Sequence, residues 1–106
     1  MATQVIYNGQ SFLDLESGKI ATLVCGGAQM STDVEIVFED SGTVTYNNTT
    51  TEANPGQRVT LHCAGQKMLS DIVIHTYSSM YQTLYTVDSR VYTTQEEQTF
   101  TVLGSK

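Results

Sequence analysis

Short runs of alternating apolar and polar residues follow one another along most of this chain. Alternation with a period of two places successive side chains on opposite faces of a strand. Turn-forming residues separate the runs, and each run spans about four to six residues, a typical strand length. The pattern predicts eight or nine short strands in an all-β fold, an antiparallel β-sandwich that is immunoglobulin-like or a small barrel. The turn signals are Asn8-Gly9, Ser17-Gly18, Gly26-Gly27, Asp40-Ser41-Gly42, Pro55-Gly56, Ala64-Gly65 and Asp88-Ser89.

The pattern also repeats. At an offset of 38 residues, segment 18–36 aligns with segment 56–74, and eight positions are identical. A fixed period of this size indicates a supersecondary unit that buries its apolar face against its neighbours. We expect a single domain over residues 1–106, made of repeat 1 (about 5–42), repeat 2 (about 43–80) and a partial repeat 3 (about 81–103). The identical pairs are Gly18/Gly56, Thr22/Thr60, Leu23/Leu61, Cys25/Cys63, Gly27/Gly65, Met30/Met68, Asp33/Asp71 and Ile36/Ile74.

Comparison of the repeats indicates which strand faces are buried. Alternate positions are apolar or small in both repeats, whereas the positions between them mix apolar with charged residues. The shared apolar set is expected to point into the core. The predicted core residues are Leu23, Cys25 and Ile36 of repeat 1 and Leu61, Cys63 and Ile74 of repeat 2, and the predicted outward residues include Thr22, Glu35, Thr60, His62 and His75.

Two segments lack a clear strand pattern. Between Tyr77 and Tyr85 the apolar residues also fall at helical spacing, so a strand is the preferred interpretation and a short amphipathic helix the alternative. The polar run Asn47–Thr51 is interpreted as a flexible loop. It holds two Asn-x-Thr glycosylation acceptors, which matter only in a eukaryotic secretory setting.

Composition and charge narrow the function classes. Sixteen Thr and six Tyr with no Trp favour strands. The net charge of −6 and five scattered basic residues argue against a nucleic-acid partner. No apolar run approaches the roughly 18 residues of a membrane span, and the first residues do not resemble a signal peptide. We therefore expect a soluble protein in the bacterial cytoplasm or in a virion, without a membrane partner.

The two cysteines occupy equivalent, inward positions. A core residue is expected at each, and free cysteine is among the most buried residue types. We interpret Cys25 and Cys63 as reduced, buried thiols and expect no disulfide, although these two are the only candidates for one. Zinc is disfavoured because only His62 and His75 accompany them, which does not make a closed ligand set. The histidines are interpreted as surface residues, with a pH-sensitive or metal-binding pair as the alternative.

Other repeated residues have structural interpretations. Asp33 and Asp71 are expected to accept hydrogen bonds from N–H groups of the glycine-containing loop and so fix the hairpin, with a cation site as the alternative. Met30 and Met68 fit apolar plugs. Tyr7, Tyr46 and Tyr85 are expected to pack their rings while their hydroxyls reach water, or else to form a face that binds carbohydrate or protein. We find no nucleophile with its base, phosphate loop or paired carboxylates, and expect neither an enzyme nor a cofactor.

The repeated pattern resembles a module of structural proteins from phages and prophages of Gram-positive bacteria. In repeat 1 the resemblance rests on Tyr7-Asn8-Gly9, the run Gly18–Leu23, and Cys25, Gly27, Met30 and Asp33-Val34. In repeat 2 it rests on Gly56, Thr60, Leu61, Cys63, Gly65, Met68 and Asp71-Ile72. It covers roughly residues 5–75 and implies a β-rich component of a tail or virion surface.

These observations together lead to two functional expectations. The leading one is a non-enzymatic phage or prophage structural protein that assembles with itself, as a homo-oligomer, or with other virion proteins through exposed strand edges. The alternative is an immunoglobulin-like adhesin or carbohydrate-binding module.

Overall fold

The computed structural model describes residues 2–77, 84–87, 90–93 and 98–104, and in that part of the chain every regular element is a strand. Within it no helix is long and apolar enough to cross a bilayer. The described residues form eleven strands, more than the eight or nine expected. They are β1 (Thr3–Tyr7), β2 (Gln10–Leu15), β3 (Ile20–Val24), β4 (Val34–Val37), β5 (Gly42–Tyr46), β6 (Thr49–Ala53), β7 (Arg58–Leu61), β8 (Ile72–Thr76), β9 (Leu84–Val87), β10 (Arg90–Thr93) and β11 (Gln98–Val102).

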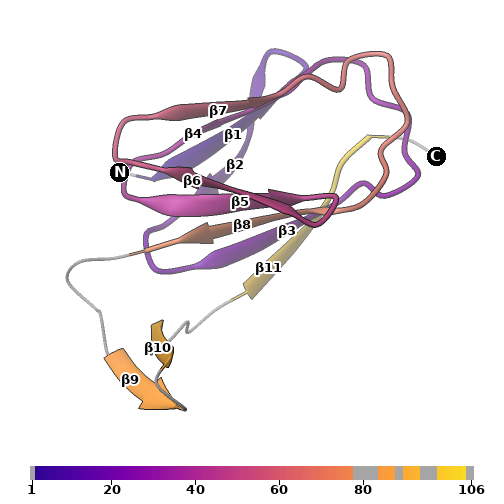
Figure 1. Cartoon of the computed structure of the whole chain (residues 1–106). Helices are drawn as coiled ribbons and strands as arrows, with labels where there is room; N and C mark the ends of the chain where they lie inside the picture. Colours follow the sequence, from indigo (N-terminus) through magenta and orange to yellow (C-terminus); the bar gives the residue numbers. More distant parts are fainter. Residues whose placement is uncertain (1, 78–83, 88–89, 94–97, 105–106) are drawn as a thin grey trace.

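The strands form two main sheets that face each other (Figure 1). The first has the order β2-β1-β4-β7 and the second the order β11-β3-β8-β5-β6, while β9 and β10 pair as a separate two-stranded sheet. The predicted all-β sandwich is confirmed. Its pairing is antiparallel except for β11, which lies parallel to β3. A parallel neighbour needs a long crossover rather than a tight turn, and here the whole of repeat 2 separates β3 from β11.

The third strand of each repeat lies in the sheet of the other. β7 of repeat 2 pairs with β4 of repeat 1, and β3 of repeat 1 pairs with β8 of repeat 2. The two pairings have equivalent registers. Val34 pairs with Leu61, and the residues at the offset of 38 from these two, Ile72 and Leu23, also pair with each other. Each sheet therefore depends on both repeats.

The core lies between the two sheets. Leu23, Cys25, Ile36 and Ile74 are fully buried and Cys63 is 5% exposed. Leu61 packs against the core but remains partly exposed, because β7 is an edge strand whereas β3, which carries Leu23, has neighbours on both sides. The largest buried side chains also include Phe38, Met30, Ile72, Leu103, Val5, Val34 and Val44.

The interpretation of Asn47–Thr51 as a flexible loop is wrong. Asn47 and Asn48 form a tight turn with positive φ angles of 50° and 62°, and Thr49 begins strand β6. Paired positive φ angles suit a two-residue hairpin. The first four residues of β6 are polar and exposed on both faces of the strand, so the sequence shows no alternation of apolar and polar residues there. In the ambiguous segment Tyr77–Tyr85, residues 84 and 85 belong to β9, and residues 78–83 lie outside the described part of the chain.

Candidate functional site

The loops that join the third and fourth strands of the two repeats meet at one end of the sandwich. Gly27 N–H donates to the Met68 carbonyl at 2.8 Å, and Gly65 N–H donates to the Met30 carbonyl at 2.8 Å. Met30 and Met68 are buried, 1% and 3% exposed, so they fill this end of the core as expected of apolar plugs. An isolated bridge joins the loops between Gln29 and Lys67. The loops are thus tied reciprocally.

Each repeated aspartate holds the loop of the other repeat. Asp71 Oδ1 accepts from the N–H groups of Cys25 at 3.0 Å and Gly26 at 2.7 Å. Asp33 Oδ1 accepts from Ala64 N–H at 2.9 Å. The acceptors and the glycine-containing loops agree with the sequence prediction, but the contact joins the two repeats instead of fixing a local hairpin. The carboxylates are therefore structural clamps.

The contacts of Asp33 favour the ionised form of its carboxyl group. The backbone N–H of Ala64 lowers the pKa of Asp33, and His62 lowers it further, its Nδ1 lying 3.2 Å from Asp33 Oδ2. A depressed folded-state pKa contributes stability above the unfolded pKa, and that contribution is lost as the pH falls through the folded-state pKa. The His62 side chain is 82% exposed, so solvent screens its contact with Asp33.

Replacing Asp71 by alanine tests the clamp. We expect a loss of about 1.5–3 kcal/mol, the usual range for hydrogen bonds to a charged group, because two N–H donors of the opposite loop lose their acceptor. Urea unfolding of the variant beside wild type measures it. Asp14→Ala is the control, since Asp14 lies on the exposed edge strand β2. Equal stability of the two variants would refute the clamp.

Both cysteines are buried free thiols. Cys25 Sγ donates to the Ser70 carbonyl and Cys63 Sγ to the Thr32 carbonyl, each at 3.7 Å. Burial, with the nearby charge of Asp71, raises the pKa of Cys25 to about 11, and burial also raises that of Cys63. Raised pKa values keep both groups as thiols at neutral pH, and a thiol is a much weaker nucleophile than a thiolate.

The tyrosines of the first two repeats brace the same loops. The Tyr7 hydroxyl accepts from Ser31 N–H at 2.9 Å, and the Tyr46 hydroxyl accepts from Leu69 N–H at 3.0 Å. Tyr7 is only 5% exposed. Each hydroxyl is therefore tied to a loop N–H group, and the Tyr46 ring is only partly buried. The Tyr85 side chain lies outside the described residues.

The two histidines lie apart, one in a loop and one on a strand. His62 follows β7 and contacts Asp33, whereas His75 lies on β8, where its buried Nε2 has no hydrogen-bond partner among the described residues. Burial lowers the pKa of His75, and its ring lies 5.2 Å from that of Tyr77. His75 is therefore only partly exposed, and not the fully exposed surface residue that the interpretation implied. Among the described residues no group of three His, Cys, Asp or Glu side chains could hold a metal ion.

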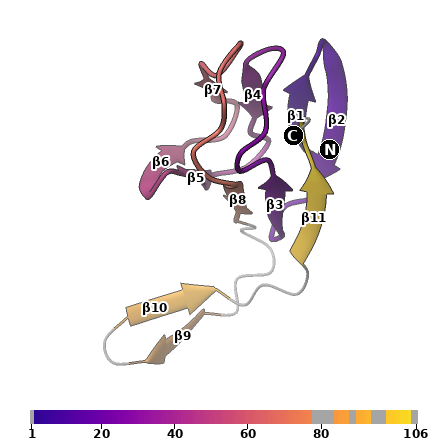
Figure 2. The same cartoon turned by 90° about the vertical axis from the view of Figure 1, so that its right-hand side faces the viewer.

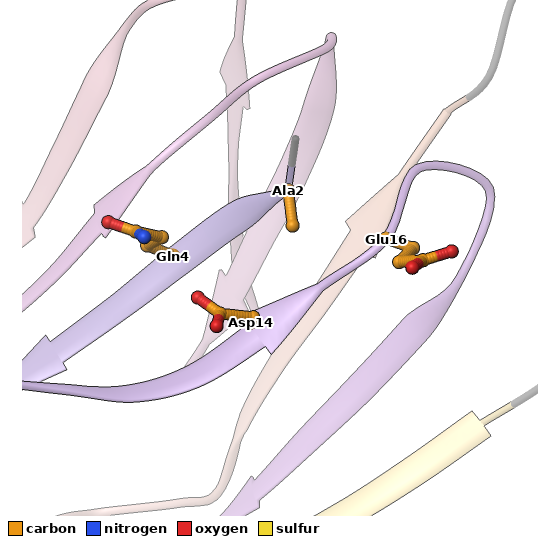
Figure 3. Close-up of a pocket in the computed structure, with 4 residues that line it drawn as sticks. All are labelled: Ala2, Gln4, Asp14 and Glu16. Atoms are coloured by element: carbon orange, nitrogen blue, oxygen red, sulfur yellow. The ribbon is translucent and has the colours of Figure 1, made fainter.

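Two shallow hollows lie beside β1. One of about 370 Å³ is lined by Ala2, Gln4, Asp14 and Glu16 (Figure 3). In Figure 3 Asp14 and Gln4 lie on neighbouring strands, while Glu16 lies on the loop beyond β2. The acidic lining supplies neither a base with a nucleophile nor a closed ligand set. The other, about 200 Å³, is lined by Ile6, Tyr7, Asn8, Gly9, Thr32, Asp33 and Glu35.

No protein-family model, curated protein or solved structure matches this chain.

The sequence analysis missed an exposed apolar pair on β11. Phe100 is 68% exposed and Val102 is 71% exposed. They are two residues apart, so both side chains project from the outer face of the five-stranded sheet, opposite Thr22 and Val24 of β3. The alternation in residues 99–103 was the signal, since it places Phe100 and Val102 on one face, but it does not say whether that face is buried.

Proposed function

We propose that this chain is a non-enzymatic structural protein that acts through protein–protein assembly, as its resemblance to modules of phage and prophage structural proteins implies. The observation that supports assembly is the exposed pair Phe100 and Val102 on β11. Burying one such side chain is worth roughly 1.5–3 kcal/mol. A partner that covers both gains enough to offset part of the cost of association.

The chemistry of the chain supports the non-enzymatic assignment. The thiols are buried with raised pKa values, and the clamp carboxylates are engaged by backbone N–H groups. The geometry does not favour the carbohydrate-binding alternative. Tyr7 is buried, and Tyr46 is engaged by a loop, so these two rings do not form an open stacking face.

Light scattering coupled to size-exclusion chromatography tests assembly. Over about 10 μM to 1 mM, a range that covers weak association, we expect the mass to rise above the 11.6 kDa of one chain. A screen against a glycan array is expected to give no specific binding. A strict monomer that binds a defined glycan would contradict the proposal and support the adhesin alternative.

A further inference from the structure

Four strands form the edges of the two main sheets, and one of them differs in composition. β2 carries Asp14, β6 carries Glu52 and β7 carries Arg58. β11, with the sequence Gln-Thr-Phe-Thr-Val, has no charged residue, proline or glycine. Natural edge strands are commonly protected by charge, proline or bulges, because an unprotected edge offers its backbone groups to another strand. By this criterion β11 is the unprotected edge.

Among the described strands, β11 has a neighbour on one side only. One side pairs with β3, from Gln98 opposite Ile20 to Val102 opposite Val24. No described strand pairs with the other side. Figure 2 shows β11 in yellow alongside β3 at the end of its sheet. The edge and the exposed pair Phe100 and Val102 are therefore one continuous surface.

We propose that β11 pairs antiparallel with β11 of a second copy of this chain, joining the two five-stranded sheets across a two-fold axis. The inference rests on the proposed function and names its partner. Phe100 is the middle residue of β11, so full overlap of the two strands places it opposite its counterpart. Val102 then lies opposite Gln98 of the second copy. Closed two-fold dimers are the commonest symmetric assemblies.

Charge ranks the edges at which two copies can meet. Each chain carries a net charge of −6, so the least unfavourable contact between two copies is one that brings no further like charges close together. Two-fold pairing through β2 or β6 would bring two like carboxylates, from Asp14 or Glu52, into the new interface, and like charges across strands are destabilising. Pairing through β11 brings none, and it places the Phe100 side chains of the two copies in contact on the outer face.

Cysteine cross-linking tests the register. Directly opposite residues in antiparallel strands lie about 4.5–5.5 Å apart at Cα, within the reach of a disulfide. Phe100→Cys is expected to form a disulfide-linked dimer under mild oxidation. Val102→Cys is the matched control, since its counterpart lies four residues further along, about 14 Å away. The native Cys25 and Cys63 are buried and do not compete. Equal cross-linking of both variants, or of neither, would overturn the register.

Charge substitution tests the edge itself. Phe100→Glu is expected to weaken the dimer at least tenfold by light scattering, because it places two carboxylates opposite each other. Leu69→Glu is the control and should not change it, since Leu69 is equally exposed, at 73%, but lies outside β11. If wild type assembles and Phe100→Glu does so equally, the β11 inference fails and the proposed function stands. A wild-type monomer throughout the concentration range overturns the inference and removes self-assembly from the proposed function. Species that grow beyond a dimer with concentration also overturn it, since they indicate open head-to-tail pairing.

Discussion

Replacing Gly42 by alanine is expected to destabilise the fold by about 3 kcal/mol or more, at the upper end of the cost of overpacking. A Cβ at this position would overlap the backbone carbonyl of His75 and approach Cε2 of Phe38 to 2.6 Å. The backbone is not free to shift, because Gly42 pairs with Ala53 on one side and Thr76 on the other. Phe38 is itself only 1% exposed and belongs to the buried core. Urea unfolding monitored by tyrosine fluorescence measures the loss.

Gly56→Ala is the control for the Gly42 substitution. Gly56 has a φ of 81°, and a Cβ added there would meet no neighbouring atom within 4 Å, so alanine meets backbone strain alone, about 1–2 kcal/mol. The comparison separates steric overlap from strain. If Gly42→Ala unfolds within about 1 kcal/mol of wild type, then β5 does not lie between β6 and β8 as described.

Strand faces could be predicted from the sequence because they depend on local alternation. Leu23, Cys25, Ile36 and Ile74 lie on the inward set and are fully buried. The all-β sandwich follows from the same alternation together with the turn residues. Strand β6 could not be predicted in this way, since its exposed threonines show no contrast between faces.

Strand partners could not be predicted from the alternation. A tight turn of two residues specifies a hairpin, as Asn47 and Asn48 do for β5 and β6. The third and fourth strands of each repeat are joined by a long loop, which leaves the partner open, and each third strand crosses to the other repeat. The aspartates show the same limit. Asp71 accepts from the N–H of Cys25, which lies 46 residues away in the sequence. A local turn would need the same carboxylate and the same kind of glycine-containing loop, so the sequence pattern does not distinguish the two contacts.

Equivalent positions of the two repeats need not contribute equally to the free energy of unfolding. Strand β11 covers one repeat at a position where the other has no such neighbour among the described strands. Leu23 and Leu61 are related by the offset of 38. β11 lies beside β3 and leaves Leu23 with no exposed area, whereas β7 has no such neighbour among the described strands and Leu61 stays partly exposed. The docked strand continues into Leu103, whose N–H donates to the Val24 carbonyl at 3.0 Å and whose side chain is 1% exposed.

Leu23→Ala is therefore expected to cost about 3–5 kcal/mol, and Leu61→Ala about half as much, because the cost of deleting a leucine side chain depends on how completely it is buried and on the cavity left behind. Urea unfolding of both variants gives the comparison. Ile36→Ala and Ile74→Ala form the control pair, since both residues are equivalent by the offset and fully buried, and their losses should agree within about 1 kcal/mol. Equal losses at Leu23 and Leu61, with the isoleucine pair also equal, would mean that β11 does not cover the edge of β3 in solution, and the β11 dimer would lose the strand on which it depends.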